Sequence, residues 1–176
     1  SRHFVTTLGN RSPARIVVTH YHPDHVGNAA WLGERFGLPV WMTAAEFLTA
    51  HAVQTGHSAH ALADTCALFR AHGVDEDHVA ALEARGNAYR RGVPTLPAAY
   101  RRLFPGATLK LGGSEFRVVP GYGHSPEHAS LHGADRRVLI SGDMLLPKIS
   151  TNVAVWPAEP DADQLARFLA SLATFE

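Results

Sequence analysis

The segment ARIVVTHYHPDHVG, residues 14–27, joins a short apolar run to a cluster of histidine and aspartate residues. The run ARIVVTH is rich in β-branched side chains and predicts a buried strand. It leads into a loop that carries His20, His22, Asp24 and His25. Side chains at a strand end can converge on a cleft while the scaffold stays rigid. Imidazole nitrogen and carboxylate oxygen suit zinc and also accept iron or manganese, so the segment predicts a metal site.

Two later segments repeat the arrangement of a strand followed by a potential ligand. SEFRVVP leads into GYGHSPEH, where the glycines would let His124 reach a crowded site. RRVLI leads into SGDML, which leaves Asp143 at a third strand end. A carboxylate there can bridge two cations and offset their charge. A polar loop with satisfied histidines would explain an isolated His-x-His, but three such strand ends favour one converging metal site.

The segments that follow the histidine cluster predict a helix, a strand and then a long helical stretch. VGNAAWLGERFG predicts a helix closed by Gly37, and LPVWM (38–42) predicts a second strand. Strand, helix and strand in this order favour a right-handed crossover and parallel pairing. From Thr43 to about Pro105 the apolar spacing is helical.

Strands return after the helical stretch. ATLKL, SEFRVVP and RRVLISG predict strands, with Gly112-Gly113 as a hairpin turn between the first two, and ASLHG is a shorter candidate. Near the end, Pro160-Asp161 predicts the start of a helix, with Gln164 at the capping-box position. The apolar residues of this helix have the spacing of a face that covers a sheet: Leu165, Phe168, Leu169 and Leu172.

The composition narrows the class of protein. A length of 176 residues favours one domain with a sizeable core. Sixteen basic and sixteen acidic side chains cancel, which disfavours a nucleic-acid partner. We find no apolar run long enough for a membrane span. The single cysteine, Cys66, rules out an internal disulfide and fits a reducing, cytoplasmic compartment. Nucleic-acid and membrane partners are therefore not expected, and the composition leaves the oligomeric state open.

The pattern His20-x-His22-x-Asp24-His25, followed by His124 in a Gly-His-Ser-Pro setting and Asp143 after Ser-Gly, resembles the metallo-β-lactamase superfamily. The resemblance runs from about residue 14 to residue 143, which is most of the chain. It implies an α/β fold, a four-layer αβ/βα sandwich, here as one partial domain over residues 1–176 with a helical insertion at about 43–105.

The resemblance also implies a ligand set and a reaction. His20, His22 and His124 would hold the first metal, Asp24 and His25 the second, and Asp143 would bridge them. Two zinc ions are expected in the full-length protein, with iron or manganese as alternatives. A metal-bound hydroxide would hydrolyse a small ester, thioester, lactone or amide. Asp24 would orient the attacking water and shuttle its proton, which makes it the candidate catalytic residue.

The chain departs from the family pattern at both ends. The strands that normally precede the histidine motif, with their Asp-x-Gly turn, are absent. The family also carries a last histidine on the second metal, and no histidine follows Asp143. We therefore interpret the chain as truncated at both ends, and we expect the second metal position to be the weaker one. The ending GDMLLPKIS resembles larger bacterial members of uncertain substrate.

The sequence is also compatible with two other functions. Single-iron thiol or persulfide dioxygenases of the same fold share two of the histidines and the aspartate. A non-catalytic protein that holds a metal and binds a ligand is the other alternative. Among the remaining histidines, His128 and His132 flank the site loop and could contact the ligands or the substrate. Trp156 is either a core residue or part of the cleft wall, and five histidines are expected to be solvated or capping: His51, His57, His60, His72 and His78.

Overall fold

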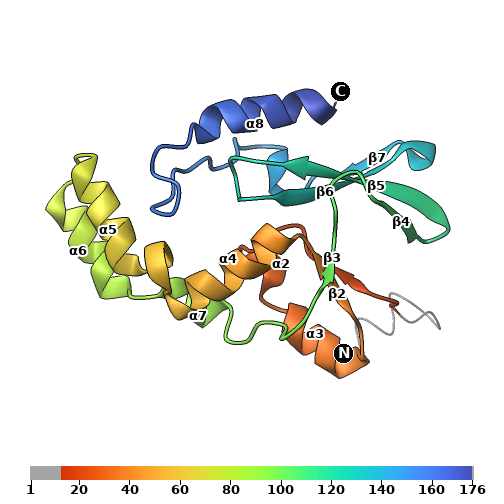
Figure 1. Cartoon of the computed structure of the whole chain (residues 1–176), viewed down its shortest axis with the longest axis horizontal. Coiled ribbons are helices and arrows are strands. Elements are labelled where there is room, and N and C mark those ends of the chain that lie inside the picture. The colour runs from red at the N-terminus through yellow and green to blue at the C-terminus, as the bar shows by residue number, and fades with distance from the viewer. Residues whose placement is uncertain (1–12, 176) are drawn as a thin grey trace.

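The computed structural model describes residues 13–175, and its helices and strands form two sheets with helices on their outer faces (Figure 1). The first sheet is parallel, with the order β1-β2-β3. Its strands are β1 (Ile16–Val17), β2 (Val40–Met42) and β3 (Arg101–Arg102). The second sheet is antiparallel, with the order β4-β5-β6-β7. Its strands are β4 (Thr108–Leu111), β5 (Ser114–Gly121), β6 (His128–Gly133) and β7 (Val138–Ile140).

The helices fall into two groups around these sheets. On the side of the parallel sheet lie α2 (Pro23–Val26), α3 (Ala29–Phe36), α4 (Ala44–Thr55), α5 (Leu62–Ala71), α6 (Glu76–Arg85) and α7 (Ala88–Gly92). On the side of the antiparallel sheet lies α8 (Gln164–Leu172) (Figure 1). Single 3₁₀ turns complete the chain: η1 (Ser58–His60), η2 (Ala134–Arg136), η3 (Gly142–Met144) and η4 (Ala173–Phe175).

Two apolar clusters hold these layers together. One lies between the sheets, where Val17 and Trp41 of the parallel sheet pack against residues of the antiparallel sheet such as Phe116 and Leu131. The other lies between the parallel sheet and its helices, and includes Val26 and Met42. The layers therefore follow the order helix, sheet, sheet, helix, which confirms the expected α/β class and αβ/βα sandwich.

The local sequence explains the strand pairings that position the site. The predicted parallel pairing is confirmed, with Ile16 opposite Val40, and Gly37 closes α3 with a positive φ of 63°. Strand β1 is shorter than predicted, because its backbone leaves the sheet early. Val18 still donates to the carbonyl of Trp41 at 2.9 Å, but the carbonyl of Thr19 accepts from Ala129 of β6 at 2.8 Å. The chain thus crosses from one sheet to the other immediately before the first histidine of the motif.

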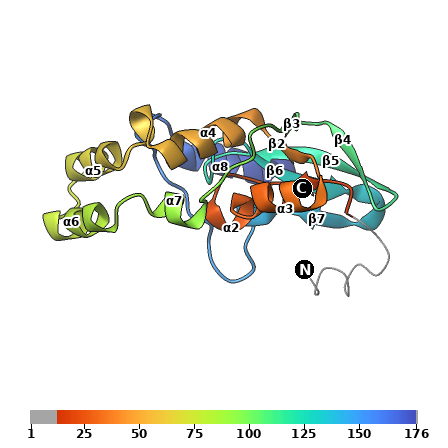
Figure 2. The same ribbon diagram turned by 90° about the horizontal axis from the view of Figure 1, so that it is seen from below.

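The helical insertion was predicted at about 43–105, and the predicted position of its C-terminal end is wrong. Its helices end at Gly92, and β3 pairs in parallel with β2 inside the predicted range. Two exposed arginines form this strand, so no apolar or β-branched pattern marks it in the sequence. Helices α5 and α6 project away from the sheets as a pair in both ribbon views (Figures 1 and 2). Of the helices in the described part of the chain, none is long and apolar enough to cross a membrane.

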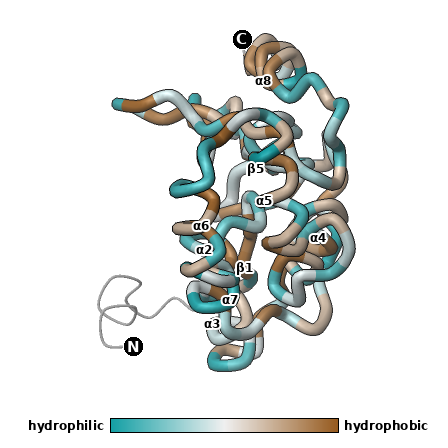
Figure 3. The backbone as a smooth tube through the Cα atoms, turned by 90° about the vertical axis from the view of Figure 1, so that its left-hand side faces the viewer, coloured by the Kyte–Doolittle hydropathy of each residue, from teal (hydrophilic) through white to brown (hydrophobic). Residues whose placement is uncertain are grey.

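The predicted start of the last helix at Pro160-Asp161 is also wrong. Helix α8 begins at Gln164, because Asp163 caps it by accepting from the amide of Ala166 at 2.8 Å. Figure 3 shows hydrophobic positions along this helix in brown. Leu165 and Leu169 remain 58% and 57% exposed.

Candidate metal centre

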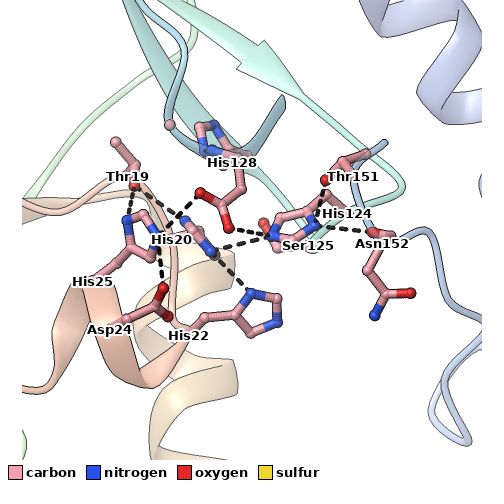
Figure 4. A network of polar contacts seen from close by, with 12 residues as sticks. Thr19, His20, His22, Asp24, His25, His124, Ser125, His128, Thr151 and Asn152 are labelled. Atoms are coloured by element: carbon pink, nitrogen blue, oxygen red, sulfur yellow. Dashed lines mark hydrogen bonds and ion pairs between the residues drawn. The ribbon is translucent and has the colours of Figure 1, made fainter. Parts of the chain in front are cut away.

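Four segments bring six histidine and aspartate side chains to one end of the two sheets (Figure 4). The contributing segments are the end of β1, the turn of α2, the loop after β5 and the 3₁₀ turn η3. The six residues are those that the sequence motifs predicted: His20, His22, Asp24, His25, His124 and Asp143. Their assignment as metal ligands remains a prediction.

Backbone geometry explains how neighbours in the sequence approach from different directions. His22 has an extended ψ of 150°, and Pro23 then begins the helical turn of α2. Proline suits this first position because its fixed φ is helical and its missing N–H would have no partner there. His22 therefore lies on extended backbone, whereas Asp24 and His25 come from the helical turn. In η3, Gly142 has a positive φ of 50°, and a Cβ there would lie 2.4 Å from Nε2 of His128. Glycine thus allows the backbone that precedes Asp143 to pass close to His128.

The first group consists of three histidines and one aspartate. Each of its four residues offers one ligand atom, and these atoms lie within 4.8 Å of one another: His20, His22, His124 and Asp143. Nε2 of His20 is 2.9 Å from Nδ1 of His22 and 3.2 Å from Nε2 of His124. His20 and His124 are buried.

The second group consists of Asp24, His25 and Asp143. Nε2 of His25 lies 3.1 Å from a carboxylate oxygen of Asp143 and 3.4 Å from one of Asp24. The other oxygen of Asp143 lies 3.7 Å from Nε2 of His124 in the first group. Asp143 therefore belongs to both groups, whereas the Asp24 side chain is 75% exposed at the edge of the site.

Hydrogen bonds on the far side of the rings orient the histidines. The carbonyl of Asn152 lies 2.9 Å from Nδ1 of His124 and can only accept, so this Nδ1 donates and Nε2 is the nitrogen that faces His20. Oγ1 of Thr19 lies 3.0 Å from Nδ1 of His20 and 3.3 Å from Nδ1 of His25. Such outer hydrogen bonds fix the tautomer of metal-binding histidines. Three imidazoles with a carboxylate, beside a second histidine and carboxylate, form a donor set that fits zinc, iron or manganese.

Burial keeps the central histidines neutral, as metal binding requires. Burial, reinforced by the surrounding histidines, lowers the pKa of His20 far below its usual range. The same causes lower the pKa of His22 to about 4 and that of His128 to about 3.

We predict from these pKa values that the metal-free protein loses stability as the pH falls below 6.5. The unfolded chain then takes up protons on these histidines, whereas the folded chain does not until the pH reaches the lowered values. Between pH 6.5 and 5, each fully buried histidine is expected to remove about 2 kcal/mol from the free energy of unfolding. Urea denaturation at pH 7 and pH 5 measures this loss. A free energy of unfolding that is equal at both pH values would contradict the prediction.

Other residues around the site differ in how well the sequence identified them. His128 is buried beside His20, with ring centroids 4.9 Å apart, and its Nε2 accepts from the amide of Asp143 at 3.3 Å. It therefore contacts a predicted ligand, as the sequence allowed. His132 instead lines a separate cavity near β7. Sequence reasoning missed Thr19, and it missed Glu46, a fully buried carboxylate of α4. Neither residue belongs to a sequence motif that would indicate a role beside a metal site.

A cavity of about 540 Å³ is lined in part by Tyr21, the residue between His20 and His22 in the sequence. Its walls include Tyr21, Thr49, Tyr122 and Trp156. A smaller adjoining cavity shares Tyr21 and Trp156 and reaches His22. Trp156 is therefore part of the cleft wall, and its ring meets that of Tyr21 edge-on at 6.3 Å. His60, which we expected to be solvated or capping, lines both cavities.

Comparisons with known proteins identify the family and the fold. The sequence model of the metallo-beta-lactamase superfamily matches residues 6–173. A beta-lactamase domain protein from Burkholderia ambifaria has a TM-score of 0.80 and 42% identity, over 92% of this chain and 45% of that chain. A metallo-beta-lactamase family protein from Thermus thermophilus has a TM-score of 0.73 and 30% identity, over 97% and 54%. The protein TTHA1623, solved in a di-iron-bound form, has a TM-score of 0.60 and 26% identity, over 99% and 68%.

Among curated proteins, an uncharacterized protein of Aquifex aeolicus (strain VF5) is 28% identical over 131 residues. These residues are 74% of this chain and 48% of the Aquifex protein. The chain thus spans about half the length of this protein and of the Burkholderia and Thermus structures.

Proposed function

This chain belongs to the metallo-beta-lactamase superfamily, and from that membership we propose that it is a metal-dependent hydrolase of a small acyl substrate. The substrate class is an ester, thioester, lactone or amide. One observation carries the proposal: three histidines and an aspartate form one group of potential ligand atoms within 4.8 Å of one another, and the same aspartate forms a second such group with another histidine and aspartate. A purely structural histidine cluster has no need of two buried imidazoles whose ring nitrogens face each other.

We propose that the first group holds one metal, that Asp24 and His25 hold a second, and that Asp143 serves both. Bound metal ions would supply the positive charge that polarises a scissile carbonyl and makes water more acidic. Zinc fits the imidazole-rich first group best. The di-iron-bound form of TTHA1623, a protein with 26% identity, supports iron as the alternative.

The chain's own residues supply the remaining steps. Asp24 is mostly exposed beside His25, so a carboxylate oxygen there can accept a proton from an attacking water and pass it to the leaving group. His128 and Thr19 hold the neighbouring groups in place through the amide of Asp143 and the Nδ1 atoms of His20 and His25.

The larger cavity, which Tyr21 and Trp156 line together with the smaller one that reaches His22, favours a small, largely uncharged substrate over a nucleic acid. Its aromatic walls suit an apolar substituent. Its one arginine, Arg167, pairs with Glu159 at 2.9 Å and so does not present an isolated positive charge. His60, also in the wall, has a pKa lowered by burial, which favours the neutral form.

Metal removal tests the proposal on the whole protein. We expect dialysis against a chelator to abolish hydrolysis of a panel of esters, thioesters and lactones, and we expect zinc to restore it. Elemental analysis of the protein as purified gives the metal and its stoichiometry. Hydrolysis that survives complete metal removal would refute the proposal. One iron per chain together with oxygen uptake on thiol substrates would replace it with the dioxygenase alternative.

A further inference from the structure

Glu46 is a buried carboxylate that contacts the two segments carrying the three histidines of the first group. It belongs to the first turn of α4 and is fully buried. Its Oε2 accepts from the amide of Tyr21 at 2.9 Å. Its Oε1 accepts from Oγ of Ser125 and from the amide of Glu127, both at 2.7 Å. One side chain thus accepts from three donors, and two of these hydrogen bonds are buried.

These three donors belong to the segments that carry the predicted ligands. Tyr21 lies between His20 and His22, and Ser125 directly follows His124. Glu127 leads into His128, the residue that contacts Asp143. The Glu46 carboxylate therefore ties the end of β1 to the loop after β5.

The position of Glu46 in its helix makes this use of the side chain unexpected. Thr43 is the N-cap of α4 and accepts from the amide of Glu46. A glutamate three residues after such a threonine forms a capping box, in which its carboxylate reaches back to the N-cap amide. Here the carboxylate instead accepts from the two loops of the metal centre. Burial raises the pKa of Glu46 to about 7, so its placement opposes ionisation while its three donors favour it.

We propose that Glu46 is a positioning residue that sets the spacing between the His20-His22 segment and the His124 loop, and thereby the metal affinity of the first group. This inference rests on the proposed metal-binding function of that group. Glu46 lies in α4, which also leads into the projecting helices α5 and α6. The helical stretch therefore contributes directly to the geometry of the metal centre.

The variant Glu46→Gln is expected to keep the hydrogen bonds to the loop after β5 and to lose the one to Tyr21. The amide oxygen can still accept from Ser125 and Glu127, but the amide nitrogen then faces the N–H of Tyr21, donor against donor. Loss of a direct partner of a ligand usually costs about 10- to 100-fold in metal affinity, and Glu46 acts on the ligands through their sequence neighbours, so we expect this variant to lower metal affinity by up to about 10-fold. We also expect it to change the visible absorption spectrum of bound Co²⁺, because the ligand geometry shifts.

The test uses the whole protein loaded with Co²⁺, with affinity measured by competition against a chelator. Val79→Ala is the matched control, because Val79 is fully buried in α6, away from the site loops. It is expected to lower the unfolding midpoint and to leave the Co²⁺ affinity and spectrum unchanged. If E46Q does not fold, Ser125→Ala removes one of the three hydrogen bonds and is expected to lower the affinity by a smaller factor.

An E46Q protein with the wild-type Co²⁺ affinity and spectrum would overturn the proposal. The same holds for an S125A protein with wild-type affinity where E46Q cannot be obtained. A spectral change in V79A equal to that in E46Q would also overturn it, because the effect would then follow from stability alone. Since the readout is metal binding, a wild-type protein that binds Co²⁺ but hydrolyses no substrate would count against the proposed hydrolysis only.

Discussion

Replacement of Asp143 by alanine is expected to remove metal from both positions of the centre. The Asp143 carboxylate lies 3.1 Å from Nε2 of His25 through one oxygen and 3.7 Å from Nε2 of His124 through the other. Loss of an outer partner already costs about 10- to 100-fold in metal affinity. Loss of a shared ligand should therefore lower both metal affinity and turnover by more than about a hundredfold. Elemental analysis after dialysis measures the first effect, and kcat measures the second.

The control for this variant is Asp135→Ala. Asp135 is exposed in η2, within the same part of the chain, and contributes to neither group of potential ligands. It is expected to behave as the wild type. A D143A protein that retains two metals per chain would show that Asp143 is not the shared ligand.

Replacement of Asp24 by alanine is expected to lower kcat by about 10²- to 10⁴-fold, the usual contribution of a positioned acid or base. The side chain of Asp24 is mostly exposed and approaches only the second group, so the first group should keep its metal. KM should change much less than kcat, because the cavity walls do not include this residue. Steady-state kinetics and metal analysis of the same preparation separate the two effects.

Asp24→Asn distinguishes proton transfer from metal binding at this position. The asparagine keeps an oxygen that can contact a metal, but it cannot take up a proton at neutral pH. We expect it to be nearly as slow as the alanine variant while holding more metal. Glu34→Ala, an exposed change in α3, serves as the control. Preserved turnover in either Asp24 variant would refute the proposed role.

The six candidate ligands could be predicted because their spacing is a property of the sequence. His20, His22, Asp24 and His25 follow one apolar strand, and His124 and Asp143 each follow another. Their partners could not be predicted in this way. His124 is oriented by the backbone carbonyl of Asn152, an acceptor that every residue possesses.

Glu46 shows a second reason why the site was only partly predictable. The sequence Thr43-Ala-Ala-Glu46 is the pattern of a capping box at the start of a helix. This pattern accounts for Glu46 without any partner from a distant part of the chain. Its actual partners, Tyr21 and Ser125, lie 25 and 79 residues away in the sequence. Such contacts depend on the tertiary arrangement alone.

The fold was predictable where apolar spacing and turn residues act together. The predicted hairpin of β4 and β5 is confirmed by their antiparallel pairing. Its turn could be predicted because Gly112 and Gly113 readily adopt the positive φ values of 56° and 85° found there. Strand β3 was missed because Arg101 and Arg102 are exposed and belong to the sheet only through their backbone. The start of α8 was misplaced because two aspartates near the helix could each have served as its cap, and Asp163 does so.

The chain passes from one sheet to the other at Thr19, and this has a consequence for folding. His20 and His124 are 104 residues apart in the sequence, and their contact joins a segment that follows the parallel sheet to one that follows the antiparallel sheet. An ion bound between them would favour the folded over the unfolded chain, by about 1.4 kcal/mol for each tenfold excess over its dissociation constant. With one cysteine, this chain has no internal cross-link to do the same. The metal would then act as a reversible cross-link that slows the separation of the sheets, so the rate of unfolding should depend on the supply of metal.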